Sequence, residues 1–146
     1  MYRRTTAKLI EVSDDLHKVV ISLNLNWKNK NYAGSIFGGS MLAATDPIYM
    51  IQLIQILGDD YVVWDKAVEA RYRKPAKSRI YGEFIFSEEE IEVIKKDVAT
   101  KNEIDIVKTM NLVDTKQQII ATFNKTLYIA DKRFYKQKLK QRQAKL

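Results

Sequence analysis

The stretch that decides the fold runs from Ile36 to Gly58 and reads I-F-G-G-S-M-L-A-A-T-D-P-I-Y-M-I-Q-L-I-Q-I-L-G. A glycine pair opens it, a mostly apolar helical pattern continues it for about five turns, and Gly58 is a typical helix terminator. Asp46 is the one carboxylate in this run. A carboxylate on an apolar helix is costly to bury unless it is hydrogen-bonded or functional. Asp46 is therefore the first candidate for a functional residue.

Two starting points for this helix are compatible with the sequence. Ser40 is a good N-cap residue directly after the glycine pair. Asp46 and Pro47 form an equally good pair of N-cap and first helical residue, in which case Asp46 only caps its own helix. If the helix begins at Ser40, Pro47 lies near the end of its second turn and is expected to bend it.

The composition indicates one globular domain, because 46% of the 146 residues are hydrophobic and 29% are charged. Met41–Leu57, the most apolar run, is shorter than the roughly 20 residues that span a bilayer, which favours a helix buried against a sheet. The absence of cysteine excludes disulfides, thiolate nucleophiles and cysteine-bound metals. The first residues are polar and lack the apolar core of a secretory signal, so a cytoplasmic location is expected.

The net charge of +7 is concentrated at the C-terminal end. Residues 131–146 contain seven lysines and arginines against one acidic residue, which leaves a charge of +1 for the rest of the chain. A run of this kind is typical of a solvated helix or a frayed end. Binding of nucleic acid or an anionic membrane through this basic tail is the less favoured alternative.

Alternation of apolar and polar residues predicts five strands, and helical signals predict two shorter helices beside the central one. The expected strands cover residues 18–27, 61–72, 79–86, 104–113 and 118–130. A short helix is expected over Thr6–Val12. Ser87 and Glu90 form a capping box that opens a second short helix, which buries Ile91, Ile94 and Val98.

The strand expected over 61–72 has an apolar and a polar face. Strict alternation places Val62, Trp64, Val68, Ala70 and Tyr72 on one side, and Asp65, Glu69, Arg71 and Arg73 on the other. Lys66 falls on the apolar side. A lysine there is expected to pair with a carboxylate or to extend its stem outward to water.

The order of elements predicts an α+β fold. Helices do not alternate with every strand, so a doubly wound parallel sheet is not expected. The central helix is apolar nearly all round and needs cover on its far side as well. An antiparallel sheet of five to six strands that wraps around this helix provides that cover.

The same arrangement resembles the hotdog fold of acyl-CoA thioesterases. The segment N-Y-A-G-S-I-F-G-G-S-M-L-A-A-T-D is similar to the signature of the phenylacetyl-CoA and medium-chain thioesterase branch, with matching spacing at Asn31, Gly34, Gly38, Gly39 and Asp46. The later segments W-D-K-A-V-E-A-R-Y-R-K-P and A-T-F-N-K-T-L-Y-I resemble a less characterised, DUF4442-like hotdog subgroup. The resemblance covers residues 16–130 as the hotdog domain, with an N-terminal segment at 1–15 and the basic tail at 131–146.

The resemblance implies hydrolysis of an acyl-CoA-type thioester without a cofactor or metal. Asp46 would act as base or nucleophile, with Thr45 as a weaker second candidate. The amide of Gly39, at a helix N-terminus, would bind the oxyanion, and Asn31 would orient the water or the carbonyl. Phe37 stands where the thioesterases have a histidine, which favours the alternative of a non-catalytic hotdog protein that binds an acyl or CoA-like ligand.

Further residues are candidates for contact with the substrate, each with a plain structural alternative. Arg71, Arg73 and Lys74 can bind the phosphates of coenzyme A, although a solvated strand end explains them equally well. Lys66 can orient Asp46 or bind phosphate, or simply pair with an acid. Phe37 and Gly38 complete the set, and the glycine pair can also be a mere tight turn. Hotdog relatives pair edge strands into dimers with the active site between the subunits, so a homodimer or a tetramer is expected.

Overall fold

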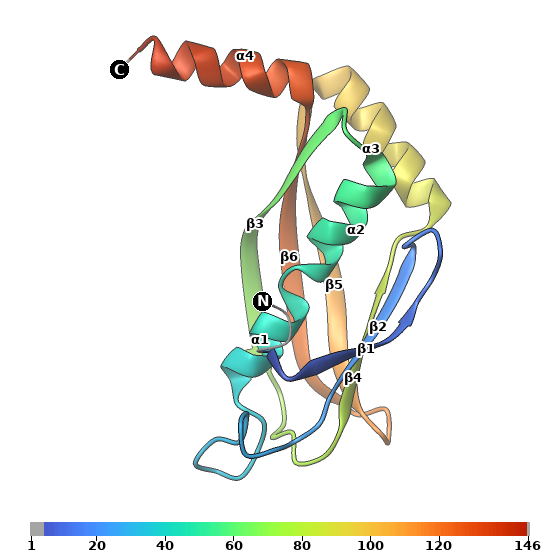
Figure 1. Cartoon of the computed structure of the whole chain (residues 1–146), viewed down its shortest axis with the longest axis vertical. Coiled ribbons are helices and arrows are strands. Elements are labelled where there is room, and N and C mark those ends of the chain that lie inside the picture. The colour runs from blue at the N-terminus through green and yellow to red at the C-terminus, as the bar shows by residue number, and fades with distance from the viewer. Residues whose placement is uncertain (1–4, 146) are drawn as a thin grey trace.

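The computed structural model describes residues 5–145, and within them the chain forms one sheet and four helices (Figure 1). The strands are β1 Ala7–Val12, β2 Lys18–Leu23, β3 Tyr61–Tyr72, β4 Ile80–Ile85, β5 Glu103–Asp114 and β6 Ile119–Asp131. The helices are α1 Gly38–Thr45, α2 Ile48–Leu57, α3 Glu88–Lys101 and α4 Lys132–Gln143.

The sheet has six strands in the order β1-β2-β4-β5-β6-β3, and all neighbours are antiparallel. α1 and α2 follow one another along one face of the sheet (Figure 1). The sheet face toward them supplies fully buried side chains such as Ile21, Phe84, Phe123 and Leu127, which pack with Leu53 of α2. The predicted α+β architecture, a curved antiparallel sheet around a central helix, is confirmed.

The central helix is bent at Asp46-Pro47, as the sequence predicts for a helix that begins before Pro47. α1 begins at Gly38, with Phe37 as its N-cap residue, rather than after Ser40. Asp46 lies at the C-terminal end of α1, and no side chain caps α2. The alternative in which Asp46 caps its own helix is therefore wrong.

Together α1 and α2 form a 20-residue stretch, Gly38–Leu57, that is long and apolar enough to cross a membrane. This stretch is longer than Met41–Leu57, the apolar run that the sequence predicts to be a buried helix. Length and composition of one such helix are weak grounds for a span, because the core helix of a globular protein meets the same test. Here the helix packs on the sheet through Ala44, Tyr49 and Leu53.

β1 replaces the short helix that the sequence predicts over Thr6–Val12. It pairs with β2 from Ala7 opposite Leu23 to Val12 opposite Val19. A tight turn with Leu16 at a positive φ of 61° joins the two strands. The helix prediction failed because the free edge of β2 offers hydrogen bonds that a short uncapped helix does not have.

β2 is shorter than the strand predicted over 18–27. It ends at Leu23 because the side chains of asparagine residues take over the backbone groups that follow. Asn26 accepts from the amide of Lys28, and Asn29 accepts from the amide of Asn26.

A bulge in β3 changes which side chains face the helices. The register with β6 shifts between Asp65 and Ala67, so Lys66 is the additional residue of the bulge. Asp65 lies opposite Leu127, and Val68 lies opposite Lys125. Opposed residues share a sheet face, so both Asp65 and Val68 are on the face of α1 and α2. The prediction that placed Asp65 and Val68 on opposite faces is wrong, because strict alternation does not hold across a bulge.

α3 and α4 agree with their predictions. Ser87 and Glu90 form the capping box of α3, and Ile91, Ile94 and Val98 are buried.

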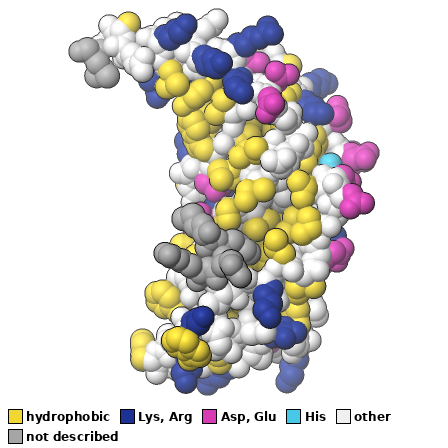
Figure 2. Space-filling model, viewed as in Figure 1, with side chains coloured by type: hydrophobic (Ala, Val, Ile, Leu, Met, Phe, Trp, Pro, Cys, Tyr) yellow, Lys and Arg dark blue, Asp and Glu magenta, His cyan; other side chains and the backbone are white. Residues whose placement is uncertain are grey.

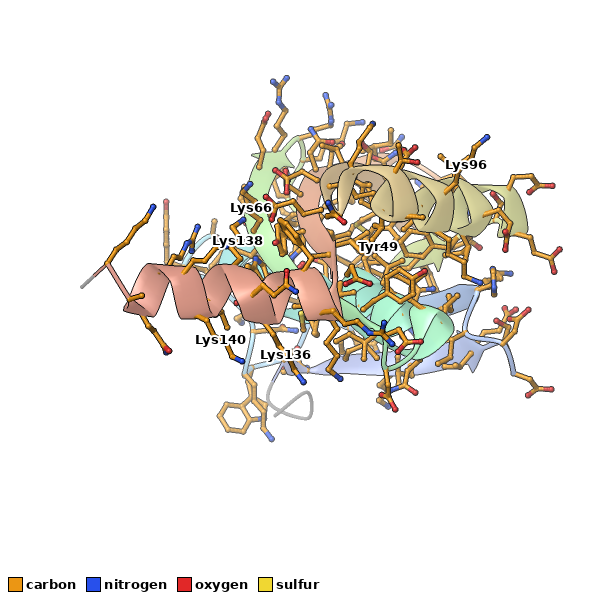
Figure 3. All side chains as sticks on the ribbon, turned by 90° about the horizontal axis from the view of Figure 1, so that it is seen from above. Tyr49, Lys66, Lys96, Lys136, Lys138 and Lys140 are labelled. Carbon is orange, nitrogen blue, oxygen red and sulfur yellow. The ribbon has the colours of Figure 1, made fainter. Side chains whose placement is uncertain are left out.

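The basic segment is a helix, α4, that projects from the end of β6 and has no buried residue (Figure 1). Lys136 and Lys140 lie on one side of it, and Lys138 lies on the other (Figure 3). Nζ of Lys138 lies 2.5 Å from the carboxylate of Glu103.

Candidate active site

Lys125 is a buried lysine in the middle of β6. It alternates in phase with the core residues Phe123 and Leu127, and only 1% of its side chain is exposed. A charge in such a place is costly unless acceptors and opposite charges surround it. The ammonium group of Lys125 has three partner atoms, which come from two other parts of the chain.

Asp46 supplies two of these partners. Nζ of Lys125 lies 2.9 Å from the backbone carbonyl oxygen of Asp46 and 2.7 Å from its Oδ1. The side chain of Asp46 is 53% exposed. Asp46 therefore connects the buried ammonium group to the surface at the joint between α1 and α2.

Asp65 supplies the third partner, because the bulge turns it toward the helices. Its Oδ1 lies 3.1 Å from Nζ of Lys125, an ion-pair contact rather than a hydrogen bond, and its side chain is 20% exposed. Burial raises the pKa of Asp65, Lys125 acts in the opposite direction, and the charge of Asp46 raises it further. Two carboxylates thus share one ammonium group, and we refer to the three residues as the Asp46 cluster.

A second group of residues lines a hollow of about 380 Å³ near the N-terminus of α1. It includes four residues that the sequence singles out: Asn31, Gly38, Arg73 and Lys74. Tyr72 also lines the hollow, and its hydroxyl donates to the carbonyl oxygen of Gly38 at 3.0 Å. The structure therefore brings the predicted phosphate-binding cations Arg73 and Lys74 close to the glycine pair.

Asn31 uses its side chain to hold its own loop. Oδ1 accepts from the backbone amides of Ala33 and Ser35, each at 3.0 Å, and Nδ2 donates to the hydroxyl of Ser35. This explains in local terms why an asparagine precedes the glycine pair. The residue shapes the loop that leads into α1.

Gly39 is the second residue of α1, a position whose amide has no acceptor within the helix. The ring of Phe37 covers it, since a Cβ atom at Gly39 would lie 2.4 Å from that ring. Phe37 itself is 58% exposed. The absence of a side chain at Gly39 therefore allows the ring to lie close to the helix N-terminus, and a larger residue would displace the exposed ring.

The proposed base and the proposed oxyanion donor are not neighbours within one chain. Gly39 and Asp46 lie seven positions apart on a single helix, which corresponds to roughly 10 Å of helical rise. Asp46 is also not among the residues that line the hollow. Thr45 is fully buried, and its hydroxyl donates to carbonyl oxygens of its own helix, so it is not available for catalysis.

Lys66 and Arg71 lie away from both groups. Nζ of Lys66 lies 2.5 Å from the carboxylate of Asp105. Asp105 is opposite Tyr128, whose ring stacks on Trp64 on the sheet face away from α1 and α2. Arg71 pairs with its neighbour Glu69 at 2.8 Å. It is therefore Lys125, and not Lys66, that contacts Asp46.

Neither Lys125 nor Asp65 is predicted as a site residue from the sequence, although the sequence contains a signal for Lys125. Lys125 takes an apolar position in the alternating series Phe123, Lys125, Leu127, Ile129. A lysine at an apolar strand position is expected to pair with a carboxylate or to extend outward to water, and this expectation applies to Lys125 as it does to Lys66. Asp65 had no such signal, because its orientation depends on the bulge.

Residues 3–129 match the model of a protein family described as a domain of unknown function, DUF4442. The chain belongs to the DUF4442 family. No curated protein matches the chain at a significant level. The fold of this DUF4442 protein is similar to that of several solved structures.

A protein of unknown function from Pseudomonas aeruginosa, described as a probable thioesterase, has a TM-score of 0.77 over 88% of this chain and 85% of its own, at 17% identity. A protein of unknown function from Chlorobaculum tepidum has a TM-score of 0.70, with 88% and 85% covered, at 16% identity. A thioesterase from Haemophilus influenzae has a TM-score of 0.63, with 88% and 81% covered, at 10% identity. At such identities the likeness shows the fold, and the predicted hotdog fold of this DUF4442 protein is confirmed.

Proposed function

We propose that the protein is a thioesterase that hydrolyses acyl-CoA-type thioesters in the cytoplasm, with Asp46 as its reacting carboxylate. The observation that supports this most is the Asp46 cluster. A half-exposed carboxylate on the central helix of a hotdog fold is fixed from behind by a buried ammonium group. Structural relatives described as thioesterases support the reaction class.

The chemistry needs only a carboxylate and a hydrogen-bond donor. As a general base, Asp46 takes a proton from a water molecule whose oxygen bonds to the thioester carbonyl carbon. The carbon–sulfur bond then breaks, and the thiolate leaves as a thiol with the proton returned from Asp46. As a nucleophile, Asp46 instead bonds to the thioester carbonyl carbon through a carboxylate oxygen and displaces the thiolate, which takes a proton from water; water then hydrolyses the resulting anhydride to the free acid and regenerates the carboxylate. In both routes an amide such as that of Gly39 stabilises the oxyanion.

A homodimer is the simplest way to bring the two groups together. The separation along α1 keeps Gly39 and Asp46 of one chain apart, so we propose that the carboxylate of one subunit meets the helix N-terminus of the other. β3 is an edge strand, paired only with β6, and edge strands favour pairing with another chain. Ile51 and Ile54 of α2 are 46% and 40% exposed. Hydrophobic side chains gather on the face that carries α1 and α2 (Figure 2).

The hollow beside the N-terminus of α1 is our proposed site for the anionic part of the substrate. Arg73 and Lys74 line it, and Nε of Arg73 donates to Thr122 at 3.1 Å while Nζ of Lys74 contacts Gln118 at 3.3 Å. Both cations are partnered by neutral groups in these contacts, which leaves their charges available for phosphate.

Hydrolysis of a panel of acyl-CoA substrates by the wild type and by Asp46→Asn tests this function. We expect kcat to fall by on the order of 100-fold or more in the variant, as for loss of a general base. Asp105→Asn is the matched control, because Asp105 also pairs with a lysine but lies on the other sheet face. Its kcat is expected to equal that of the wild type. Activity that survives Asp46→Asn would contradict the proposal.

A non-catalytic, ligand-binding hotdog protein is the second candidate. The contact of the Phe37 ring with Gly39 favours it, because the ring lies against the residue whose amide an oxyanion would need. Acyl-CoA that binds to the wild type without turnover, measured by calorimetry on the same panel, is the result expected from this alternative.

A further inference from the structure

Lys125 is a buried charge that the proposed reaction does not use directly. With 1% of its side chain exposed, it does not reach a substrate. Its stability role is also not obvious, because apolar residues in place of all members of a buried ion pair are often as stabilising as the pair itself. Phe123 and Leu127, its neighbours on the same face of β6, are fully buried apolar residues. The ammonium group therefore calls for an explanation beyond packing.

The geometry around Nζ restrains Asp46 at two points. Lys125 holds the backbone carbonyl oxygen and Oδ1 of the same residue, so both the bend of the helix and the side-chain rotamer are fixed. Oδ2 of Asp46 has no hydrogen bond or ion pair with any residue in the described part of the chain, and the side chain is 53% exposed. One oxygen is thus anchored while the other is presented outward.

Asp65 restrains the ammonium group from the side of β3. Its contact at 3.1 Å lies on the same sheet face, and the bulge at Lys66 produces that orientation. Three segments that are far apart in the sequence therefore converge on one Nζ atom. A free carboxylate at a helix bend would sample several rotamers, whereas a reacting carboxylate gains rate from being held in one.

We propose that Lys125 is a positioning residue that holds Asp46 in its reactive orientation, and that Asp65 fixes Lys125 in place. This inference rests on the proposed function, since it assigns Lys125 to the same site. Lys125 acts through Asp46 and does not itself contact the thioester.

The absence of cysteine from the chain allows a direct test. Lys125→Cys is alkylated with 2-bromoethylamine in urea and refolded, which restores a lysine-like ammonium group. Alkylation with 1-iodopropane gives a neutral side chain of the same length and is the matched control. We expect kcat of the unmodified variant to fall by on the order of 100-fold with a nearly unchanged KM, and only the aminoethylated protein to recover it.

Recovery by the neutral propyl group would show a purely structural role and overturn the inference. So would a Lys125→Cys variant with wild-type kcat, while Asp46→Asn is inactive. If the wild type hydrolyses no thioester, it is the proposed function that fails, and the inference fails with it.

Asp65→Asn and a spectroscopic measurement keep the inference testable if Lys125→Cys does not fold. Asp65→Asn preserves the shape of the side chain, and we expect a several-fold lower kcat at unchanged KM. In ¹⁵N spectra of the lysine side chains, the buried ammonium group of Lys125 is expected to give a slowly exchanging signal that shifts in Asp46→Asn. An unshifted signal would show that Lys125 does not hold Asp46.

Discussion

Lys125 and Lys66 show how differently two lysines among apolar neighbours can be used. Lys125 stays in phase with the core and is buried, and it contacts two partly exposed carboxylates. Lys66 occupies a bulge, and its ion pair with Asp105 leaves both side chains about half exposed, at 51% and 42%. Exposed pairs contribute little to stability, whereas removal of one partner from a buried pair is costly.

This difference predicts the effect of removing each ammonium group. Lys125→Met leaves Asp65 without its counter-charge, and we expect the free energy of unfolding to fall by about 3 kcal/mol, because both carboxylates still reach water in part. Lys66→Met is the control, with an expected loss below about 1 kcal/mol. Urea unfolding at neutral pH measures both. Equal effects would contradict the assigned environments.

A second residue-scale prediction concerns Glu90, which accepts from Lys108 at 2.6 Å and from the amide of Ser87 at 2.8 Å. Burial raises the pKa of Glu90, but the hydrogen bonds with Lys108 and Ser87 outweigh it, so the pKa is lowered from its ordinary 4.5. The folded state then binds this proton more weakly than the unfolded state. The stabilisation is present above pH 4.5 and is lost as the pH falls through the lowered value.

Glu90→Gln keeps the shape of the capping box and removes the charge. We expect the variant to be less stable than the wild type by about 1 kcal/mol at pH 7, allowing for the exposure of the pair. The difference should disappear at about pH 2, where the wild-type carboxyl is also protonated. Thermal unfolding at the two pH values checks this. A constant difference would show that the charge of Glu90 is not involved.

At the scale of elements, the bulge in β3 decides which residues can form the site. Because of the bulge, Asp65 and Val68 lie on the same sheet face, which places the carboxylate of Asp65 on the face of Lys125. Deletion of Lys66 together with Ala67 should bring Val68 directly after Asp65 and turn one half of β3 to the wrong face. Deletion of Lys66 alone is the control, because it removes only the additional residue and leaves Asp65 and Val68 on the face that they share.

We expect the double deletion to lose the cooperative urea transition, while the deletion of Lys66 alone remains folded. Near-ultraviolet circular dichroism reports on Trp64, which stacks on Tyr128 beside the bulge. A double-deletion variant with a native spectrum would show that the strand tolerates the other register.

The elements that the sequence predicts well are those with local signals. The strand over Tyr61–Tyr72 and the helix capped by Ser87 have the expected bounds or cap. β1 was missed because its strand state depends on pairing with β2, which is not visible in residues 6–12 alone. The facing of Asp65 was missed because one residue in a bulge, Lys66, changes the phase.

The site shows the same difference between residues with a local signal in the sequence and residues whose role depends on contacts made in the folded chain. Asp46 and the glycine pair are recognisable because their spacing is local, and Arg73 and Lys74 follow from charge at a strand end. Lys125 lies 79 positions from Asp46, so only the folded chain shows that they meet. Sequence reasoning therefore finds the candidate carboxylate but not the group that holds it.

At the scale of the whole molecule, the proposed homodimer yields a prediction. Ile54 is 40% exposed on α2, beside the edge strand β3. If this face is covered by a second subunit, Ile54→Lys buries an unpaired charge and should weaken dimerisation by on the order of 100-fold. Sedimentation velocity measures the mass of the wild type and the variant.

Val93→Lys is the control, because Val93 is 56% exposed on α3, a different part of the surface. It should leave the mass unchanged. A monomeric wild type would contradict the dimer, and with it the proposal that two chains complete one site.

The convergence of three segments on Nζ of Lys125 has a consequence for protein synthesis. Lys125 belongs to β6, the last strand to leave the ribosome, whereas Asp46 emerges much earlier. A nascent chain that stops short of β6 carries Asp46 without its anchor. If Asp46 is the reacting carboxylate, as we propose, premature termination products are expected to be inactive as well as incompletely folded, because the carboxylate is held in place only when the sheet is complete.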